Sequence, residues 1–263
     1  MTRGRARPKV AVVIPAGGSG TRVGGRVPKQ FMRLAGEPIL ATTASRFAAH
    51  PAVLLLVVAV PRAHLRRARQ ALARVARRVT IGIVEGGDER QESVWRGLQA
   101  VPQDTDIVLV HDAVRPFVTR SLIDGVLQAT AETGAAVCAR PIAETVKLVE
   151  DGLVRQTVDR RGLWAVQTPQ GFRADLLREA HDKARRDGVV GTDDAMLVER
   201  LGHPVRVVPG LAQNVKITTP DDLRRARAAR PRRPPSNVGR RTEPRVPRTG
   251  HPRSKPGSQP PIQ

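Results

Sequence analysis

Short apolar runs rich in Val and Ile alternate with longer helix-like segments through most of the 263-residue chain. The runs lack alternating polar residues, which is typical of strands buried on both faces of a parallel sheet. The predicted strands are Val10–Ile14, Val53–Val60, Val79–Val84, Ile107–Val110 and Ala135–Ala139. The segments predicted to be helices are Arg62–Arg78, which has no interior Gly or Pro, and Asp88–Val101 and Thr119–Glu132, which begin with capping residues. This β-α-β order predicts an open α/β fold with right-handed crossovers.

The pattern changes near residue 141. Two β-rich runs, Glu144–Glu150 and Leu153–Asp159, flank Asp151-Gly152, a strong hairpin signal because Gly tolerates a positive φ. A hairpin inserted in a parallel sheet is expected to project from it, so we predict an arm at about residues 141–170. The main pattern resumes with a strand at Val205–Val208 and a helix that Thr219 caps. The expected fold class is therefore α/β: an open, mostly parallel, Rossmann-like sheet flanked by helices, with a projecting β-hairpin arm.

The net charge of +21 is concentrated at the two ends of the chain. Residues 1–9 carry four cations and no acid, and residues 229–263 carry nine cations against one acid, so the ends supply +12 of the total. The C-terminal segment also holds nine of the 22 prolines and almost no large apolar residue, which predicts disorder. We expect a flexible basic segment at 1–9, a folded domain at 10–228 and a disordered tail at 229–263.

Cysteine content and hydropathy limit the cellular setting. Cys138 is the only cysteine, so neither an intrachain disulfide nor a cysteine-based metal site is expected. The apolar run after the basic N-terminus is too short for a signal peptide, and no run approaches the roughly 18 residues of a membrane span. We therefore expect a soluble, cytoplasmic protein that does not contact a membrane.

A glycine-rich loop follows the first predicted strand and is the strongest functional signal. Its backbone N–H groups would lie at the carboxyl end of a buried strand, where α/β proteins bind ligands and where consecutive N–H groups form an anion site. Neither the Walker pattern nor the dinucleotide fingerprint is present, and a flexible surface turn is the plainer alternative. Two cations, Arg22 and Lys29, are suited to bridging phosphate oxygens. The backbone candidates for phosphate binding are Ala16, Gly17, Gly18 and Gly20.

Two further strand ends carry polar residues. Gly86-Gly87-Asp88 follows a predicted strand and is suited to reading a base edge or a ribose, although a simple turn with Asp88 as a helix cap is an alternative. Asp112 ends another strand, and a carboxylate beside a triphosphate is a natural Mg²⁺ ligand. An ion pair with Arg115 is the structural alternative for Asp112. His111 has no partner at metal-ligand spacing, so we expect it to be an ordinary packed or solvated histidine.

The loop resembles the signature of nucleotidyltransferases that activate sugars and alcohols, with Gly17 at a usual Ala and Val23 at a usual Met. Later motifs are similar to those of the 2-C-methyl-D-erythritol 4-phosphate cytidylyltransferase family, over about Val10 to Arg227. These motifs are Gly86–Val94, His111–Pro116, Thr157–Trp164 and Thr168–Gln170. The resemblance implies transfer of CMP from CTP to a phosphorylated polyol, with Mg²⁺ as the cofactor.

Several residue roles rest on the resemblance alone. It implies that Gly87, Asp88, Ser93 and the backbone near Ala16 recognise cytosine. It implies that the arm reaches across a homodimer and completes the partner's site. The residues implied to position the acceptor phosphate are Arg160, Lys216, Thr145, Arg115, Thr168 and Thr192. The sequence departs from the family at Met196, where a Ser is usual.

We hypothesise that the acceptor phosphate attacks the α-phosphorus of CTP in line and releases pyrophosphate, with Arg22 and Lys29 stabilising the transition state. One alternative is a cytidylyl- or uridylyltransferase acting on another sugar or alditol phosphate. A second is a nucleic-acid-binding protein that uses its basic ends. Aromatic residues form 2% of the chain and Tyr is absent, so few side chains are available for bases to stack on. No specific nucleic-acid partner is therefore expected.

Overall fold

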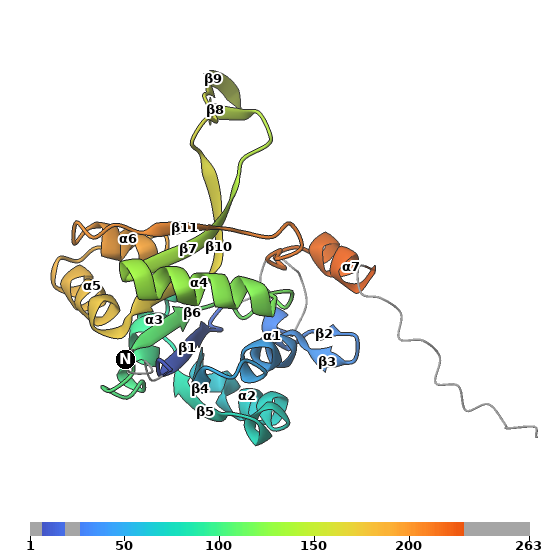
Figure 1. The fold of residues 1–263 in the computed structure, drawn as a ribbon. Helices are drawn as coiled ribbons and strands as arrows, with labels where there is room; N and C mark the ends of the chain where they lie inside the picture. Colours follow the sequence, from blue (N-terminus) through green and yellow to red (C-terminus); the bar gives the residue numbers. More distant parts are fainter. Residues whose placement is uncertain (1–6, 19–26, 229–263) are drawn as a thin grey trace, which may run out of the picture. The chain divides into compact units, whose positions relative to one another are not determined.

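A computed structural model describes residues 7–18 and 27–228 of the chain. Within these residues, seven strands form one sheet in the order β11-β7-β10-β6-β1-β4-β5 (Figure 1). The strand pairs are parallel except those of β10, which runs antiparallel to both β6 and β7. This is the predicted α/β class with an open, mostly parallel sheet. The strands are β1 Val10–Pro15, β4 Val53–Val60, β5 Thr80–Glu85, β6 Ile107–Val110, β7 Ala135–Pro141, β10 Trp164–Arg173 and β11 Arg206–Pro209.

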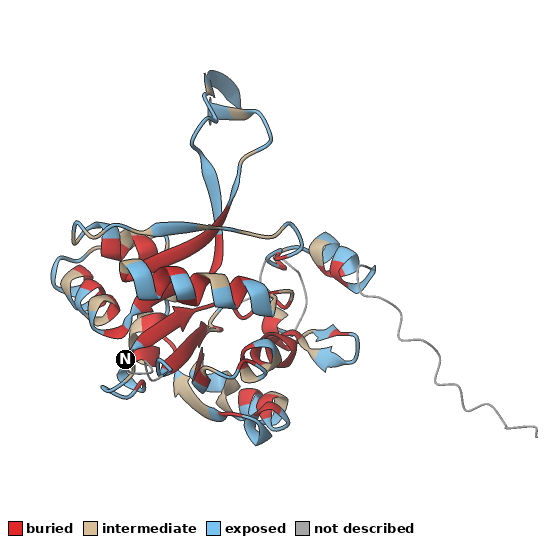
Figure 2. Ribbon diagram, viewed as in Figure 1, coloured by how far each residue is buried: buried red, intermediate tan, exposed pale blue. Residues whose placement is uncertain are grey.

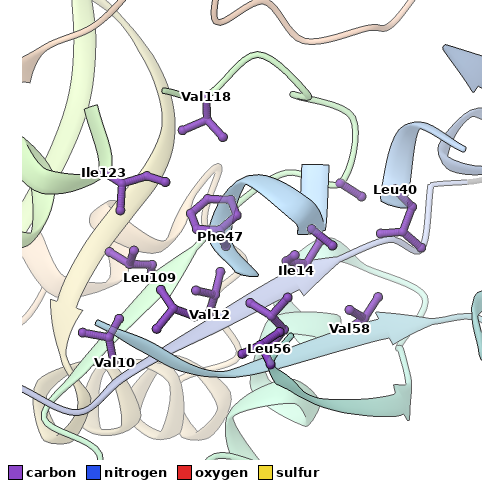
Figure 3. Close-up of a cluster of buried hydrophobic side chains, with 14 of the residues drawn as sticks. Val10, Val12, Ile14, Leu40, Phe47, Leu56, Val58, Leu109, Val118 and Ile123 are labelled. Atoms are coloured by element: carbon purple, nitrogen blue, oxygen red, sulfur yellow. The ribbon is translucent and has the colours of Figure 1, made fainter. Parts of the chain in front are cut away.

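Helices cover both faces of the sheet because successive residues of each central strand point to opposite sides. In β1, Val10, Val12 and Ile14 belong to one apolar cluster, with α1, α2 and α4 (Figure 3). Ala11 and Val13 belong to a second cluster on the other face, with α3, α5 and α6. The α-helices are α1 Ile39–Ala48, α2 Leu65–Leu72, α3 Arg90–Gln99, α4 Arg120–Thr133, α5 Ala174–Arg186, α6 Asp194–Glu199 and α7 Pro220–Ala228.

Two predicted helices differ from the observed ones. The predicted helix Arg62–Arg78 is divided into the 3₁₀ turn η3 (Arg62–His64), α2 and the 3₁₀ turn η4 (Val75–Arg77), and no Gly or Pro in the sequence marks these breaks. Asp88 does not cap α3, because the helix begins at Arg90 and Glu89 is its N-cap residue. The caps predicted for Thr119 and Thr219 are confirmed: each hydroxyl accepts a backbone N–H three residues on, at 3.2 and 3.1 Å.

The predicted hairpin is present at residues 146–158. β8 (Val146–Glu150) pairs antiparallel with β9 (Leu153–Val158), and the turn residues Asp151 and Gly152 both have positive φ, as a tight hairpin turn requires. The hairpin lies away from the main sheet and its residues are mostly exposed (Figure 2). The predicted arm of 141–170 overlaps β10, whose residues 167–172 are buried in the sheet. β10 thus carries the chain from the arm back into the core.

The remaining described elements are short. The 3₁₀ turn η2 (Lys29–Phe31) follows the glycine-rich segment, and β2 (Arg33–Leu34) pairs with β3 (Glu37–Pro38) before α1. Cys138 lies fully buried in β7. Among the described residues there is no helix that is both long and apolar enough to span a membrane. The predicted flexible ends, 1–9 and 229–263, fall largely outside the described residues, so these predictions stand untested.

Candidate functional site

A cavity of about 390 Å³ opens at the carboxyl ends of β1, β5 and β6. These parallel strands end at the same edge of the sheet, so the loops that follow them meet there. Nine of the predicted site residues line the cavity: Ala16, Gly17, Gly18, Lys29, Gly87, Asp88, Ser93, Asp112 and Lys216. Two others, Gly20 and Arg22, lie outside the described residues.

The loop after β1 is hydrogen-bonded to β4 and η2, and the loop after β5 is hydrogen-bonded to α3. The Ala16 N–H donates to the Ala59 carbonyl at 2.7 Å, and the buried Gln30 amide donates to the Ala16 carbonyl at 2.7 Å. Ser93 lies on α3 with 1% of its surface exposed, and its hydroxyl accepts the Gly87 N–H at 3.1 Å. A Cβ at Gly17 would meet the Ser93 oxygen at 3.3 Å, so glycine lets the loop after β1 approach α3 closely. Ser93 therefore holds the loop of Gly87 in place at the cavity wall.

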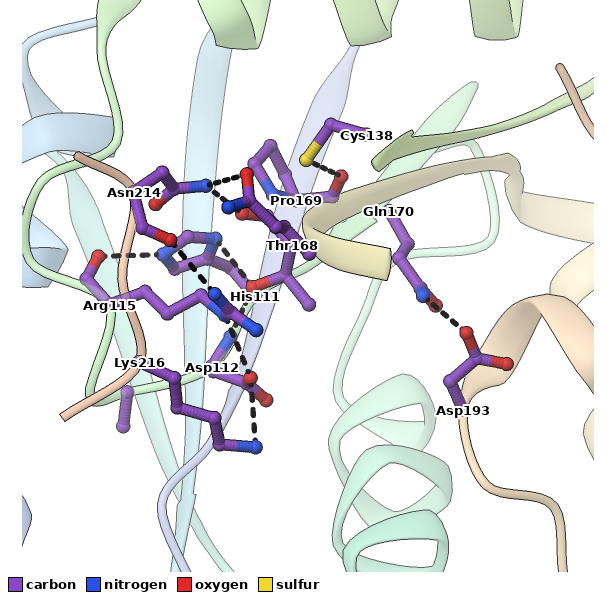
Figure 4. A network of polar contacts seen from close by, with 12 residues as sticks. His111, Asp112, Arg115, Cys138, Thr168, Pro169, Gln170, Asp193, Asn214 and Lys216 are labelled. Carbon is purple, nitrogen blue, oxygen red and sulfur yellow. Dashed lines mark hydrogen bonds and ion pairs between the residues drawn. The ribbon is translucent and has the colours of Figure 1, made fainter. Parts of the chain in front are cut away.

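Asp112 is the charged centre of the site (Figure 4). Its carboxylate lies 3.0 Å from the Lys216 ammonium and 3.2 Å from Arg115 Nε, and a third cation, Arg90, lies 3.5 Å away. Burial by itself raises the pKa of Asp112, but the charges of Lys216, Arg90 and Arg115 outweigh burial and hold the pKa below its usual range. Asp112 is therefore ionised at neutral pH, and the ion pair with Arg115 that was considered from the sequence is present.

Behind Asp112, a buried histidine and a threonine fix the backbone. The Thr168 hydroxyl accepts the Asp112 N–H at 3.0 Å and lies 3.1 Å from His111 Nδ1. His111 Nε2 lies 3.1 Å from the Arg115 carbonyl, so Nε2 carries the proton and Nδ1 accepts the hydroxyl hydrogen of Thr168. Burial lowers the pKa of His111 to about 4, which keeps the ring neutral. Of the packed and solvated histidines considered from the sequence, His111 is the packed one.

Asn214 links the C-terminal part of the chain to the same centre. Its side-chain amide donates to the Thr168 backbone carbonyl at 2.8 Å, and the Asn214 backbone carbonyl accepts a hydrogen bond from Arg115 Nη1 at 2.8 Å. Asn214 is fully buried, so these bonds set the position of the segment that carries Lys216. Sequence analysis assigned no role to Asn214.

A second set of residues that sequence reasoning missed extends from Arg90 into the core. Arg90 Nη1 donates to Asp194 Oδ2 at 2.8 Å, and His181 Nε2 lies 3.0 Å from Asp194 Oδ1. Burial by itself raises the pKa of Asp194, but the Arg90 charge and the His181 hydrogen bond lower it below its usual value. No short-range pattern marks this chain of contacts, because its members come from α3, α5 and α6.

Five of the six predicted acceptor-binding residues do not line the cavity of the single chain. Thr145 and Arg160 flank the arm and are exposed, and Arg160 donates to the Ala143 carbonyl. Thr192 is exposed before α6, with its hydroxyl 3.8 Å from the Met196 sulfur. Thr168 and Arg115 lie beside Asp112, where Arg115 Nε and Nη1 bond within the protein. The chain by itself therefore brings Lys216, and not the arm residues, to Asp112.

The donor set is suited to a Mg²⁺ ion that substrate phosphates help to hold. Asp112 and Asp88 line the cavity, and the contact of Asp112 Oδ1 with Arg90, at 3.5 Å, is at the limit of a hydrogen bond. The described residues contain no group of three or more acidic, His or Cys ligands that would form a complete protein cage. One carboxylate with phosphate oxygens is the usual arrangement for Mg²⁺.

Comparisons with known proteins find relatives over most of the chain. The family model of 2-C-methyl-D-erythritol 4-phosphate cytidylyltransferase matches residues 10–230. The protein of that name from Symbiobacterium thermophilum is 51% identical over 219 residues, with 82% of this chain and 91% of the relative covered. The one from Syntrophus aciditrophicus is 45% identical, with 82% and 94% covered. The crystal structure from Thermus thermophilus matches with a TM-score of 0.70 at 40% identity, with 84% and 98% covered.

Proposed function

The chain belongs to the 2-C-methyl-D-erythritol 4-phosphate cytidylyltransferase family, and from this premise we propose how its residues divide the work. The protein is a nucleotidyltransferase that transfers CMP from CTP to 2-C-methyl-D-erythritol 4-phosphate, in the non-mevalonate route to isoprenoid precursors. One observation carries the assignment of the site: residues 16–18 of the glycine-rich loop line the same cavity as Lys29, Asp112 and Lys216. The cytoplasmic location of the protein stays a prediction.

The reaction joins two anions. An oxygen of the acceptor phosphate forms a bond to the α-phosphorus of CTP while the bond from that phosphorus to the β-phosphate bridging oxygen breaks, and pyrophosphate leaves with the electron pair. The acceptor phosphate is already ionised at neutral pH, so the protein has to align the reactants and offset their charge rather than form a covalent intermediate.

Cations at the cavity supply that charge. Lys29 enters from η2 and, with Arg22, is assigned to the triphosphate and the departing pyrophosphate. Lys216, 41% exposed and paired with Asp112, is assigned to the acceptor phosphate. Asp112 and the phosphate oxygens would hold a Mg²⁺ ion, which supplies charge neutralisation when bound. Gly87, Asp88 and Ser93 form the wall assigned to the base and ribose, with the backbone of Ala16 to Gly18 beside it.

The arm residues are assigned to a neighbouring copy of the chain. Thr145 and Arg160 lie outside the cavity of their own chain, and the arm exposes the apolar side chains Leu153 and Val154 to 65% and 59%. Exposed apolar side chains of this extent gain free energy when a second copy covers them. A homodimer in which each arm completes the other subunit's acceptor site accounts for both observations.

Pyrophosphate release tests the activity. The purified protein is offered each of the four nucleoside triphosphates with methylerythritol phosphate or ribitol phosphate. Turnover is expected with CTP and methylerythritol phosphate. Turnover only with ribitol phosphate, or only with UTP, would replace the assigned substrates while leaving the reaction class in place.

Mixing two inactive variants tests the exchange of arms. In a mixed dimer of Arg160→Ala and Lys216→Ala subunits, one site would combine the intact Lys216 of its own chain with the intact Arg160 of the partner. When subunits reassociate at random, half of the dimers are mixed, and each mixed dimer has one intact site out of its two. Activity should therefore return to about a quarter of the wild-type value. No recovery would mean that Arg160 serves its own chain.

A further inference from the structure

We propose that Asp194, held in place by His181, keeps Arg90 away from Asp112, so that one oxygen of Asp112 stays available to the divalent cation that accompanies the nucleotide. The inference rests on the proposed assignment of that cation to Asp112. It makes Asp194 and His181 positioning residues, which contact neither substrate but set the ligand capacity of the residue that does.

The two ion pairs of Arg90 differ in length. Arg90 Nη1 lies 2.8 Å from Asp194 Oδ2, whereas Arg90 Nε lies 3.5 Å from Asp112 Oδ1. The first distance is that of a strong charge-assisted hydrogen bond, and the second is at the limit of any hydrogen bond. The Arg90 guanidinium is therefore bound to Asp194 and makes only a long, weak contact with Asp112.

The other oxygen of Asp112 is already used. Asp112 Oδ2 lies 3.0 Å from Lys216 and 3.2 Å from Arg115 Nε. Oδ1, with its single long contact, is thus the oxygen of this carboxylate that remains for an additional ligand. Whichever side chain controls Arg90 also controls access to Oδ1.

Burial makes the Asp194 position firm. The side chains of Asp194 and His181 are 1% and 0% exposed. His181 Nε2, on α5, binds Asp194 Oδ1 at 3.0 Å, so the carboxylate, at the start of α6, can turn only Oδ2 toward Arg90. A buried carboxylate without such partners would be strongly destabilising, so both contacts persist in the folded protein.

Neutralising Asp194 should release Arg90 toward Asp112. In the Asp194→Asn variant the amide still reaches His181 and Arg90 but no longer offsets the guanidinium charge. Arg90 then has Asp112 as its remaining carboxylate contact among the described residues. A closer Arg90–Asp112 pair would compete with the cation for Oδ1. Because charge-assisted hydrogen bonds are strong, this competition should weaken cation binding about tenfold.

A double-mutant cycle separates this effect from a loss of folding. Mn²⁺ binding is measured by titration calorimetry, without turnover, in the presence of a CTP analogue that carries a methylene group between the α- and β-phosphorus. Asp194→Asn should bind Mn²⁺ about tenfold more weakly. Removing the competing cation as well, in Asp194→Asn with Arg90→Gln, should restore binding to within about threefold of Arg90→Gln alone. If the double variant stays as weak as Asp194→Asn, Asp194 does not act through Arg90 and the proposal is overturned.

The chain offers a matched control. His50, just after α1, forms a similar group with Asp124 and Arg120 on α4, away from the cavity, with His50 Nε2 2.8 Å from Asp124 Oδ1. Asp124→Asn should leave Mn²⁺ binding unchanged, and an equal loss there would show that any His–Asp pair has the same effect through stability. If Asp194→Asn does not fold, His181→Asn loosens the same carboxylate and should weaken Mn²⁺ binding in the same direction.

Asp112→Asn tests the underlying assignment separately. It should abolish most Mn²⁺ binding whatever Arg90 does. Unchanged binding in Asp112→Asn would refute the proposed metal ligand, whereas a normal Asp112→Asn result with no Asp194 effect would refute only the present inference. Turnover of the wild-type protein with CTP reports on the activity independently of both.

Discussion

His111 should make the folded protein lose stability between pH 7.5 and pH 5. An unfolded chain protonates a histidine near its ordinary pKa of about 6.5, whereas burial lowers the pKa of His111 to about 4 in the folded state. Between these values the unfolded state binds more protons than the folded state, so the free energy of unfolding falls as the pH falls. Below about pH 4 both states are protonated and this contribution changes no further.

The size of the effect follows from the two pKa values. Each pKa unit corresponds to 1.36 kcal/mol, and integrating the difference in bound protons from pH 7.5 to 5 gives about 2 kcal/mol. This range stays above the usual pKa of carboxylates, so the titration of Asp and Glu adds little. For a domain of this size 2 kcal/mol is a substantial part of the total stability.

Urea denaturation at pH 7.5, 6.5, 5.5 and 5 measures the change, in the wild type and in His111→Gln. Glutamine carries no titrating charge and keeps a donor toward the Arg115 carbonyl, so the variant should lose stability at pH 7.5 but show a flatter pH dependence. His203→Gln, a change at a half-exposed histidine outside the site, should leave the wild-type slope in place. A His111→Gln protein with the full wild-type slope would refute the reasoning.

Three further outcomes are expected. Lys29→Ala should lower kcat on the order of 10²-fold or more in the pyrophosphate-release assay, and a near-normal kcat would remove Lys29 from the chemistry. Gly97→Ala should destabilise the protein by about 1–3 kcal/mol in urea denaturation, because the new Cβ would lie 2.6 Å from Val13 Cγ1 between α3 and β1. An unchanged denaturation midpoint would mean that α3 and β1 can shift to accommodate the methyl group at little cost. Deleting residues 230–263 should leave kcat largely intact, since the family match ends at residue 230, and a large loss would make the tail part of the catalytic unit.

Local chemistry made several features predictable. The central parallel strands β1, β4 and β6 are continuous apolar runs, and the hairpin turn at Asp151-Gly152 requires positive φ values that Gly adopts without strain. Thr119 and Thr219 cap their helices through contacts that span three residues. These outcomes depend on neighbours in the sequence, so the sequence contains the information needed to predict them.

The centre of the site was predictable only in part. Asp112, Lys29 and Lys216 were singled out from strand ends and family motifs, and all three line one cavity. Their partners were not predicted, because the contacts join segments far apart in the chain. Arg90 and Asp194, for example, are separated by 104 positions, and no spacing rule connects them.

The sequence by itself determined the alternation of strands and helices, the position of the glycine-rich loop at the end of the first strand and the hairpin that interrupts the pattern. The tertiary structure decided that β10 enters the sheet antiparallel between β6 and β7, which brings Thr168 against His111 and the backbone of Asp112. It also decided that His181 and Asp194 reach Arg90. The physical reason is the range of the forces involved. Propensities and caps act over a few residues, whereas burial and charge pairing depend on which strands become neighbours.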